Sequence, residues 1–234
     1  MKPTFGIVSI SFKRPQILEL FCASIQRLRT ELDMFIPCVI VGDAEHYEIC
    51  SKYHITHIAM DNHPATRKWN AGVDYLKSLG VDYYLISGSD DLMSADLIKN
   101  LMARMEQGID LIGINTIYFY STDDRHRGRM RKLIAQGQIL GVARCISKRV
   151  AEAVGGNLWN IDKSWGMDGI CLKNILPHVK SRAIVQGFCC DLKSQRESLN
   201  KFSYWQGRIP DSEDPKQLYE ILSEEELRLL IQIK

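Results

Sequence analysis

The sequence predicts an α/β fold in which a parallel β-sheet is covered by helices on both faces. Short, continuous apolar runs of strand length recur through the first half of the chain. Stretches with apolar residues at helical spacing separate these runs, as in βαβ units. The 234 residues are 45% hydrophobic and 25% charged, which is enough apolar material for one sizeable core.

The first half of the chain alternates strands and helices. Pro15 suits a first helical position, and the apolar residues that follow it share one helical face. Gly80 ends the third helix, because glycine commonly follows a helix C-terminus. The predicted strands cover residues 4–10, 36–41, 55–60 and 83–87, and the predicted helices cover 15–28, 44–53, 69–79 and 97–105.

The second half of the chain is less regular. Its predicted strands are one long strand or two abutting strands in 109–120, and one strand each in 139–146 and 183–190. From Pro215 onward the chain is predicted to be helical, with Ser223 and Glu226 spaced as a capping box. We therefore expect a single domain with a C-terminal helical tail.

Charge, cysteine content and hydropathy restrict the class of protein. The formal net charge of +2 is too small to indicate a nucleic-acid or membrane partner by itself. The sequence shows neither the apolar segment of a signal peptide nor an apolar run of membrane-spanning length. Its seven cysteines include no C-x-x-C pair, so we expect reduced thiols and no zinc site. A cytoplasmic protein without a membrane anchor is the resulting prediction.

Polar side chains follow several predicted strands at the points where the strands end. Ser9 and Ser11 lie at the end of the first strand, Asp43 follows the second, and the pair Asp90-Asp91 follows the fourth. Because ligands bind beyond the carboxyl ends of parallel strands, these groups should meet in one crevice. Adjacent carboxylates keep their charges where a cation, hydrogen-bond donors or water are near. Carboxylate oxygens suit Mg²⁺ or Mn²⁺.

The loop after the first strand lacks the glycines of a phosphate-binding loop. It reads "SISFKRPQ", which matches neither G-x-G-x-x-G nor the Walker A pattern. A bound nucleotide diphosphate would therefore have its charge neutralised by side chains and a metal ion. The alternative for the acid pair is an ordinary strand-to-helix turn in which an aspartate caps the next helix.

With these features the chain resembles the family-2-like glycosyltransferases of the GT-A fold, which use nucleotide-sugar donors. The segments "IVSISFKRP", "VIVGDAE", "RKWNAGVDYL" and "DYYLISGSDDLMSADLI" carry the resemblance, and "ILGVARCISKRVAEAVGG" and "WGMDG" extend it more loosely. It implies a Rossmann-like mixed sheet flanked by helices. The implied domain covers residues 1–210, with a nucleotide-sugar-binding half at 1–105 and an acceptor-side half at 106–210. A helical tail follows at 211–234.

The resemblance implies a metal-dependent, inverting transfer of a sugar from a nucleotide-sugar donor, expected to be a UDP-sugar, to an acceptor hydroxyl. The implied site residues are Asp168 as general base, Asp43 at the nucleobase, Asp90 at the ribose, Asp91 on Mn²⁺ or Mg²⁺, and Asp191 as a further metal or donor contact. The remaining donor-binding candidates are Ser9, Ser11, Arg14, Lys68, Asn70, Arg144 and Lys193.

The residues leave several alternatives open. Asp168 could serve only to cap the helix that follows it, and Arg144, inside an apolar strand, could pair with a phosphate or with a protein carboxylate. A nucleotidyltransferase of related fold and a non-catalytic nucleotide-sugar or glycan-binding module are the alternative functions. The acceptor could be a glycan, a protein or a modified base in DNA. Residues 125–132 hold five Arg or Lys in eight positions and are either a solvated loop or a polyanion contact.

Overall fold

The computed structural model describes the chain except residues 1, 195–200, 206–207, 210 and 234. Within the described residues the strands form a seven-stranded sheet, in the order β10-β6-β9-β4-β1-β2-β3, and a five-stranded sheet, in the order β12-β8-β7-β11-β5. The strands are β1 (Phe5–Ile10), β2 (Cys38–Gly42), β3 (Thr56–Ala59), β4 (Tyr83–Ile86), β5 (Asp91–Met93), β6 (Leu111–Gly113), β7 (Thr116–Ser121), β8 (Met130–Ile134), β9 (Arg144–Ser147), β10 (Arg182–Ile184), β11 (Cys189–Lys193) and β12 (Asp211–Glu213). The helices are α1 (Pro15–Leu32), α2 (Tyr47–Lys52), α3 (Ala65–Ser78), α4 (Ala95–Met105), α5 (Lys148–Ala153), α6 (Met167–Ile175), α7 (Lys216–Ile221) and α8 (Glu224–Gln232).

The seven-stranded sheet is parallel where strands and helices alternate in the sequence. β1 pairs in parallel with β2 and β4, and β3 pairs in parallel with β2. β9 runs antiparallel between β4 and β6, so the sheet is mixed, which confirms the fold that the resemblance implied; the parallel pairing predicted for the first half of the chain is confined to β1–β4 within that half. A strand buried on both faces shows the same apolar run in either direction, so the sequence pattern could not reveal the reversal.

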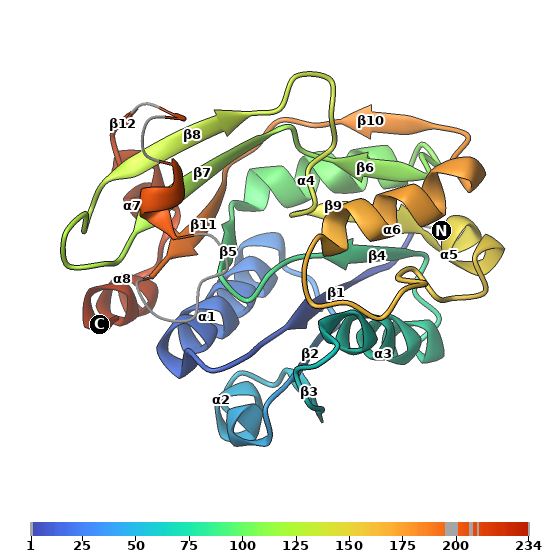
Figure 1. Cartoon of the computed structure of the whole chain (residues 1–234), viewed down its shortest axis with the longest axis horizontal. Helices are drawn as coiled ribbons and strands as arrows, with labels where there is room; N and C mark the ends of the chain where they lie inside the picture. The colour runs from blue at the N-terminus through green and yellow to red at the C-terminus, as the bar shows by residue number, and fades with distance from the viewer. Residues whose placement is uncertain (1, 195–200, 206–207, 210, 234) are drawn as a thin grey trace.

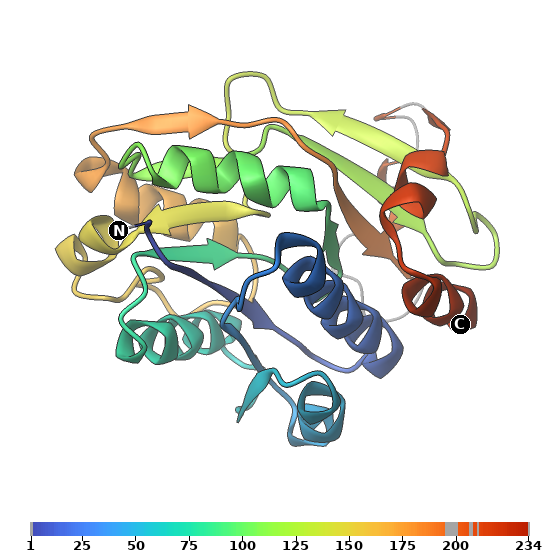
Figure 2. The same cartoon turned by 180° about the vertical axis from the view of Figure 1, so that it is seen from behind.

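Helices cover both faces of the seven-stranded sheet. Figure 1 shows α3, α5 and α6 on the face toward the viewer, and Figure 2 shows α1 and α4 on the opposite face. Phe21 and Leu97 from α1 and α4 belong to one apolar cluster, and Val73 and Val150 from α3 and α5 belong to the other. The sheet therefore separates two apolar layers, and its carboxyl-end loops stay open for a ligand.

Three predicted strands of the second half differ in extent from the observed ones. Residues 109–120 contain β6 and β7, which belong to different sheets, and residues 183–190 contain β10 and the start of β11, which are divided in the same way. In 139–146 only β9 is a strand, and it begins at Arg144. The crossings fall at Asn115 and at Gln186-Gly187, single polar or glycine positions that a strand can also contain, so the sequence did not show that the chain changes sheet there.

The basic segment 125–132 is the turn of the β7–β8 hairpin and the beginning of β8. β8 starts at Met130, and Met130 and Arg131 are 2% and 3% exposed. The guanidinium of Arg131 lies 4.4 Å from the centroid of the Phe202 ring. The interpretation of 125–132 as a solvated loop therefore does not hold for Met130 and Arg131, which are packed in the second sheet.

The C-terminal residues lie against α1 and the five-stranded sheet. Leu218 of α7 and Leu230 of α8 are buried in one cluster with Leu20 of α1. The predicted capping box is confirmed, because the backbone N–H of Ser223 donates to Glu226 at 2.8 Å and that of Glu226 donates to the Ser223 hydroxyl at 3.2 Å. β12 also pairs with β8, which adds this region to the sheet.

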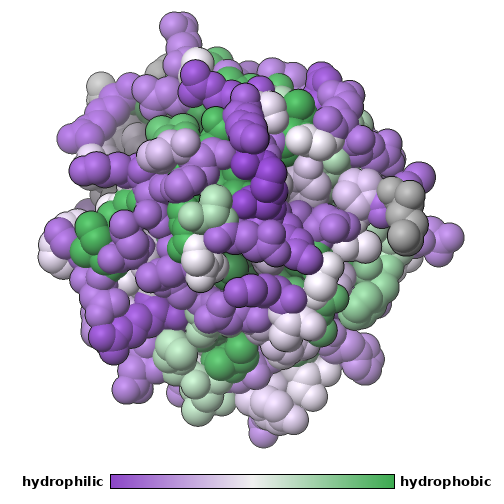
Figure 3. Space-filling model, turned by 90° about the vertical axis from the view of Figure 1, so that its right-hand side faces the viewer, coloured by the Kyte–Doolittle hydropathy of each residue, from purple (hydrophilic) through white to green (hydrophobic). Residues whose placement is uncertain are grey.

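No helix in the described part of the chain is both long enough and apolar enough to span a bilayer. The face drawn in Figure 3 is mostly hydrophilic, with apolar side chains in small separate groups. Small scattered groups of apolar residues are normal on a protein surface.

Candidate functional site

The carboxyl ends of β1 and β4 open onto a cavity of about 470 Å³. Its walls come from the loop after β1, the loop before α3, the turn after β4, β11, and the segment that leads into α6. The lining residues are Ile10, Ser11, Phe12, Arg14, Asn62, His63, Ala65, Trp69, Gly88, Ser89, Asp90, Ser164, Met167, Asp191 and Lys193. The cavity lies where the rule for open α/β sheets predicts a ligand.

The turn after β4 is shaped by two short-range contacts to Asp91. The backbone N–H of Gly88 donates to the Asp91 carboxylate, and the Ser87 hydroxyl approaches the same oxygen at 3.4 Å. A Cβ at position 88 would lie 2.6 Å from an oxygen of Asp90 and 2.9 Å from one of Asp91. A side chain at position 88 would therefore displace the carboxylates of Asp90 and Asp91 from the positions in which the turn holds them.

Asp90, Asp91 and Asp191 form an acid cluster. One carboxylate oxygen from each lies within 4.8 Å of the others. Asp91 on β5 and Asp191 on β11 are direct cross-strand partners in an antiparallel pair. Asp91 and Asp191 are 100 positions apart in the sequence and were predicted as separate site residues. The five-stranded sheet brings them together.

Burial and mutual repulsion set the protonation of the acid cluster. Burial, followed by the charges of Asp191 and Asp90, raises the pKa of Asp91 well above its usual range. Burial also raises the pKa of Asp191 to about 7, with Asp90 adding to the effect and Lys193 opposing it. Asp90 behaves differently: burial works against ionisation, but Arg14 and Lys193 outweigh it and lower the pKa of Asp90.

Two cations lie beside the acid cluster. Arg14 donates to Asp90 at 2.8 Å, and the Lys193 ammonium donates to Asp191 at 2.5 Å. Burial disfavours both charges, yet the neighbouring carboxylates raise the pKa of Lys193 and of Arg14. Arg14 adopts a left-handed conformation at φ 71° just before α1, which turns the chain into the helix beside the cavity.

The acid cluster has the chemistry of a hard divalent cation site. Oδ1 of Asp191 is buried and has no hydrogen-bond partner. A buried carboxylate oxygen without a donor is costly, and the raised pKa of Asp91 shows the same shortage of positive charge. Mg²⁺ or Mn²⁺ would satisfy these oxygens, so the residues present fit such an ion.

A second polar group lies at the ends of β1 and β2. The Ser11 hydroxyl is 2.8 Å from Nδ1 of His46, and a carboxylate oxygen of Asp43 accepts from the backbone N–H of Lys13 at 2.8 Å. Lys68 is fully buried and donates to the Ser11 carbonyl, and burial lowers its pKa. Of this group only Ser11 lines the cavity. Asp43 lines a separate hollow with Ala44, Ala59, Met60 and Asp61.

Ser9, Asn70 and Arg144 lie away from the cavity. Ser9 is buried within β1, and its hydroxyl has no partner. Asn70 donates to the Trp159 carbonyl at 2.9 Å, which ties α3 to the loop before α6. Arg144 donates to the backbone carbonyls of Leu140 and Asp168, both at 3.1 Å, so neither a phosphate nor a carboxylate is needed to account for its burial.

Asp168 lies in the first turn of α6, next to the cavity-lining residue Met167. Its side chain is exposed, and a Cβ added to Gly141 would overlap its carboxyl group. The Asp168 carboxylate therefore lies against Gly141, close in the chain to the cavity rim but outside the set of lining residues.

Four residues that line the cavity were not among the predicted site residues: Phe12, Asn62, His63 and Ser164. They come together because the loop before α6 is fastened to the start of α3: Ser164 Oγ accepts from the backbone N–H of Ala65 at 3.1 Å and lies 3.0 Å from Nδ1 of His63. The pairing joins segments about 100 residues apart, so no local pattern could reveal it. Only the position of Phe12 directly after a strand end was a usable signal.

Comparison with known proteins identifies the fold. No protein-family model and no curated protein matches the sequence. The solved structure of the bifunctional protein IspDF from Campylobacter jejuni matches 79% of this chain with a TM-score of 0.50 at 11% identity, and this chain spans 50% of that protein. A protein assigned as a glucose-1-phosphate thymidylyltransferase from Bacillus anthracis, in complex with sucrose, matches 80% of this chain and is itself covered to 89%, with a TM-score of 0.50 at 10% identity. The chain thus shares a mixed α/β, Rossmann-like fold with these two proteins.

Proposed function

We propose that this chain is a metal-dependent transferase that binds a nucleotide sugar and moves the sugar to an acceptor hydroxyl. The observation that carries the proposal is the acid cluster. Asp91 and Asp191 face each other across the β5–β11 pair, Oδ1 of Asp191 has no hydrogen-bond partner, and Arg14 and Lys193 lie beside them at the edge of the cavity. A divalent cation and a diphosphate together match this pattern of charge.

The cavity suits part of a nucleotide sugar. Its volume of about 470 Å³ falls within the usual range for small-molecule sites. Arg14 and Lys193 would neutralise oxygens of the diphosphate, and Ser11, whose carbonyl accepts from Lys68, would contact the nucleoside. A metal ion on Asp91 and Asp191 would supply charge neutralisation for the departing nucleotide.

Asp168 is the general base that we propose. Its side chain is exposed in the first turn of α6, one residue after the cavity-lining Met167, where an acceptor hydroxyl could approach from solvent. Removing the proton of that hydroxyl contributes about 10² to 10⁴ in rate. Asp168→Asn should lower transfer by that factor and leave nucleotide binding unchanged, and transfer at the wild-type rate would remove Asp168 from the role.

Nucleotidyl transfer is the second candidate, and the structural comparison favours it over glycosyl transfer. One of the proteins that share the fold is by name a thymidylyltransferase, which joins a nucleotide to a sugar phosphate. The same acid cluster would serve that reaction, in which pyrophosphate leaves a nucleoside triphosphate. Against it, the loop "SISFKRP" after β1 lacks the glycines with which such enzymes usually surround a triphosphate.

One product assay separates the functions. The chain is incubated with Mn²⁺ and either UDP-, GDP-, CDP- or TDP-sugars with glycan, protein and DNA acceptors, or the four nucleoside triphosphates with sugar 1-phosphates. Release of nucleoside diphosphate that depends on an acceptor supports glycosyl transfer, whereas release of pyrophosphate supports nucleotidyl transfer. Metal-dependent nucleotide binding with neither product indicates a binding module. An absence of nucleotide binding in every mixture would refute the whole proposal.

A further inference from the structure

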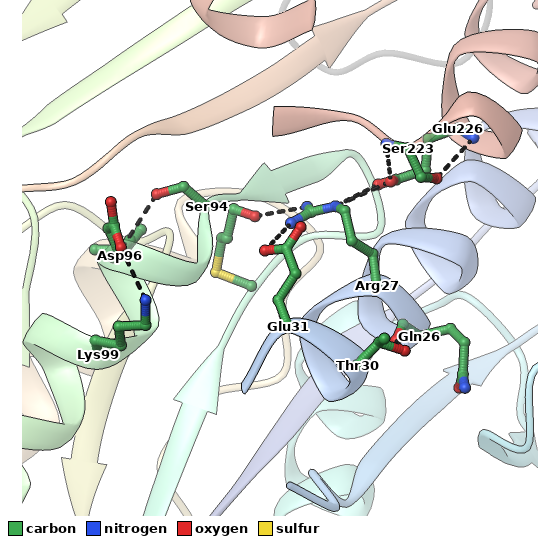
Figure 4. Close-up of polar contacts among 11 residues, drawn as sticks. Gln26, Arg27, Thr30, Glu31, Ser94, Asp96, Lys99, Ser223 and Glu226 are labelled. Carbon is green, nitrogen blue, oxygen red and sulfur yellow. Dashed lines mark hydrogen bonds and ion pairs between the residues drawn. The ribbon is translucent and has the colours of Figure 1, made fainter. Parts of the chain in front are cut away.

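Arg27 of α1 forms a buried network that joins three parts of the chain (Figure 4). Its Nε donates to both carboxylate oxygens of Glu226 on α8, at 3.1 and 2.9 Å. Nη1 donates to Glu31 at 3.2 Å, and Nη2 donates to the backbone carbonyl of Met93 at 2.8 Å. The Arg27 and Glu226 side chains are 6% and 0% exposed.

Stability alone is a poor explanation for this network. Moving two charges out of water costs free energy, and a well-packed apolar pair of similar volume is often at least as stable. The backbone contact to Met93 suggests a different role, because Met93 is the last residue of β5, the strand on which Asp91 lies.

β5 is an edge strand of three residues. It pairs with β11 on one side only, and in that pairing Asp91 lies opposite Asp191. A short edge strand has few hydrogen bonds to fix its position, so a partner on its outer side has a large effect on it. Arg27 is such a partner, and Glu226 in turn fixes the guanidinium.

We propose that Arg27, oriented by Glu226, is a positioning residue for the acid cluster. It holds β5 against β11 and so sets the separation between the Asp91 and Asp191 carboxylates that a divalent cation requires. The C-terminal helix α8 thereby becomes part of the metal site without touching it. This inference rests on the proposed function, since it requires that Asp91 and Asp191 bind a divalent cation.

The test compares Arg27→Lys with a matched control, Arg149→Lys. A lysine keeps the charge, but its three donors lie on one nitrogen and cannot span the positions of Glu226, Glu31 and the Met93 carbonyl as the planar guanidinium does. Arg149 has the same kind of partners far from β5: it donates to Asp110 through Nε at 2.9 Å and through Nη2, which also donates to the His178 carbonyl at 2.9 Å. Mn²⁺ binding is titrated by electron paramagnetic resonance below the melting temperature of each protein, and amide hydrogen exchange is followed in residues 88–96.

We expect Arg27→Lys to raise the Mn²⁺ dissociation constant about 10-fold and to speed exchange in residues 88–96, as for an outer partner of a metal ligand. Arg149→Lys should change neither quantity. Glu226→Gln should act like Arg27→Lys, and it decides the question if Arg27→Lys does not fold. Wild-type Mn²⁺ affinity in the folded variants, or an equal loss in Arg149→Lys, overturns the positioning role and leaves the proposed function intact. A wild-type chain that binds no Mn²⁺ overturns both.

Discussion

Two carboxylates with little solvent exposure, Asp110 and Asp191, have very different surroundings in this fold. Asp110 accepts from Arg149 at 2.9 Å, from the backbone N–H of Lys180 at 2.8 Å and from that of Ser181 at 3.2 Å. Burial works against its charge, but these donors outweigh burial and lower its pKa. Asp191 has Lys193 beside it, one oxygen without a partner, and a pKa raised to about 7. A satisfied carboxylate stabilises the fold, whereas an unsatisfied one is available to a ligand.

The largest effect should come from breaking the satisfied carboxylate. Asp110→Ala would leave the Arg149 guanidinium and the two backbone donors without their acceptor, and we expect the free energy of unfolding to fall by about 3 kcal/mol. Urea denaturation measures this loss. Mn²⁺ affinity at low temperature should stay at the wild-type value. A weakened affinity would contradict the view that Asp110 stabilises the fold and takes no part in metal binding.

Asp91→Asn should have the opposite pattern. Removing the metal ligand is expected to weaken Mn²⁺-dependent nucleotide binding by at least about 100-fold, more than the loss of an outer partner causes. The metal-free variant should be as stable as wild type or more stable, because an ionised carboxylate whose pKa is raised in the folded state lowers the free energy of unfolding. Thermal shift with and without Mn²⁺ and nucleotide reports both quantities. A destabilised variant with normal binding would show that Asp91 is structural.

The pH dependence of stability tests the unsatisfied carboxylate directly. The folded pKa of Asp191, about 7, lies above the unfolded value of about 4, so the folded state binds the proton more tightly. The free energy of unfolding of the metal-free protein should therefore fall as pH rises from about 4 to about 7, by at most about 1.4 kcal/mol per pH unit for this group.

Asp191→Asn should flatten this dependence in urea denaturation at pH 5, 6 and 7. The pKa values of the imidazoles of His46 and His57 are lowered by burial, and their contribution has the opposite sign, but it is common to both proteins. The difference between wild type and variant isolates the acid cluster. Parallel curves for the two proteins would rule out an unusual titration of Asp191.

The smallest effect should come from the cation beside the acid cluster. Lys193→Gln removes one charge next to the proposed diphosphate, and we expect the nucleotide dissociation constant to rise about 10-fold, the loss of one charge-assisted hydrogen bond. Isothermal titration with UDP and Mn²⁺ measures it. Lys52→Gln is a matched control, since Lys52 forms an exposed ion pair with Glu19. Equal binding by both variants would remove Lys193 from the site.

The sequence alone predicted the first four strands, the helices between them and the polar residues at the strand ends, because buried parallel strands and amphipathic helices have local periodic signatures. It also indicated Asp90 and Asp91 as site residues, since two adjacent carboxylates after an apolar strand keep their charges only where a cation, hydrogen-bond donors or water are near. These features depend on residues near one another in the chain.

Only the tertiary structure decided the direction of β9, the pairing of Asp91 with Asp191, and the burial of Arg144 against backbone carbonyls. Each depends on contacts between residues far apart in the chain. An apolar run has the same sequence whether the strand pairs in parallel or antiparallel, and a buried arginine has the same sequence context whether its partner is a charged group or a backbone carbonyl. The acid cluster is the clearest case: the sequence contains the carboxylates, but their spacing depends on the pairing of β5 with β11 in the second sheet, and their raised pKa values depend first on burial in the folded chain.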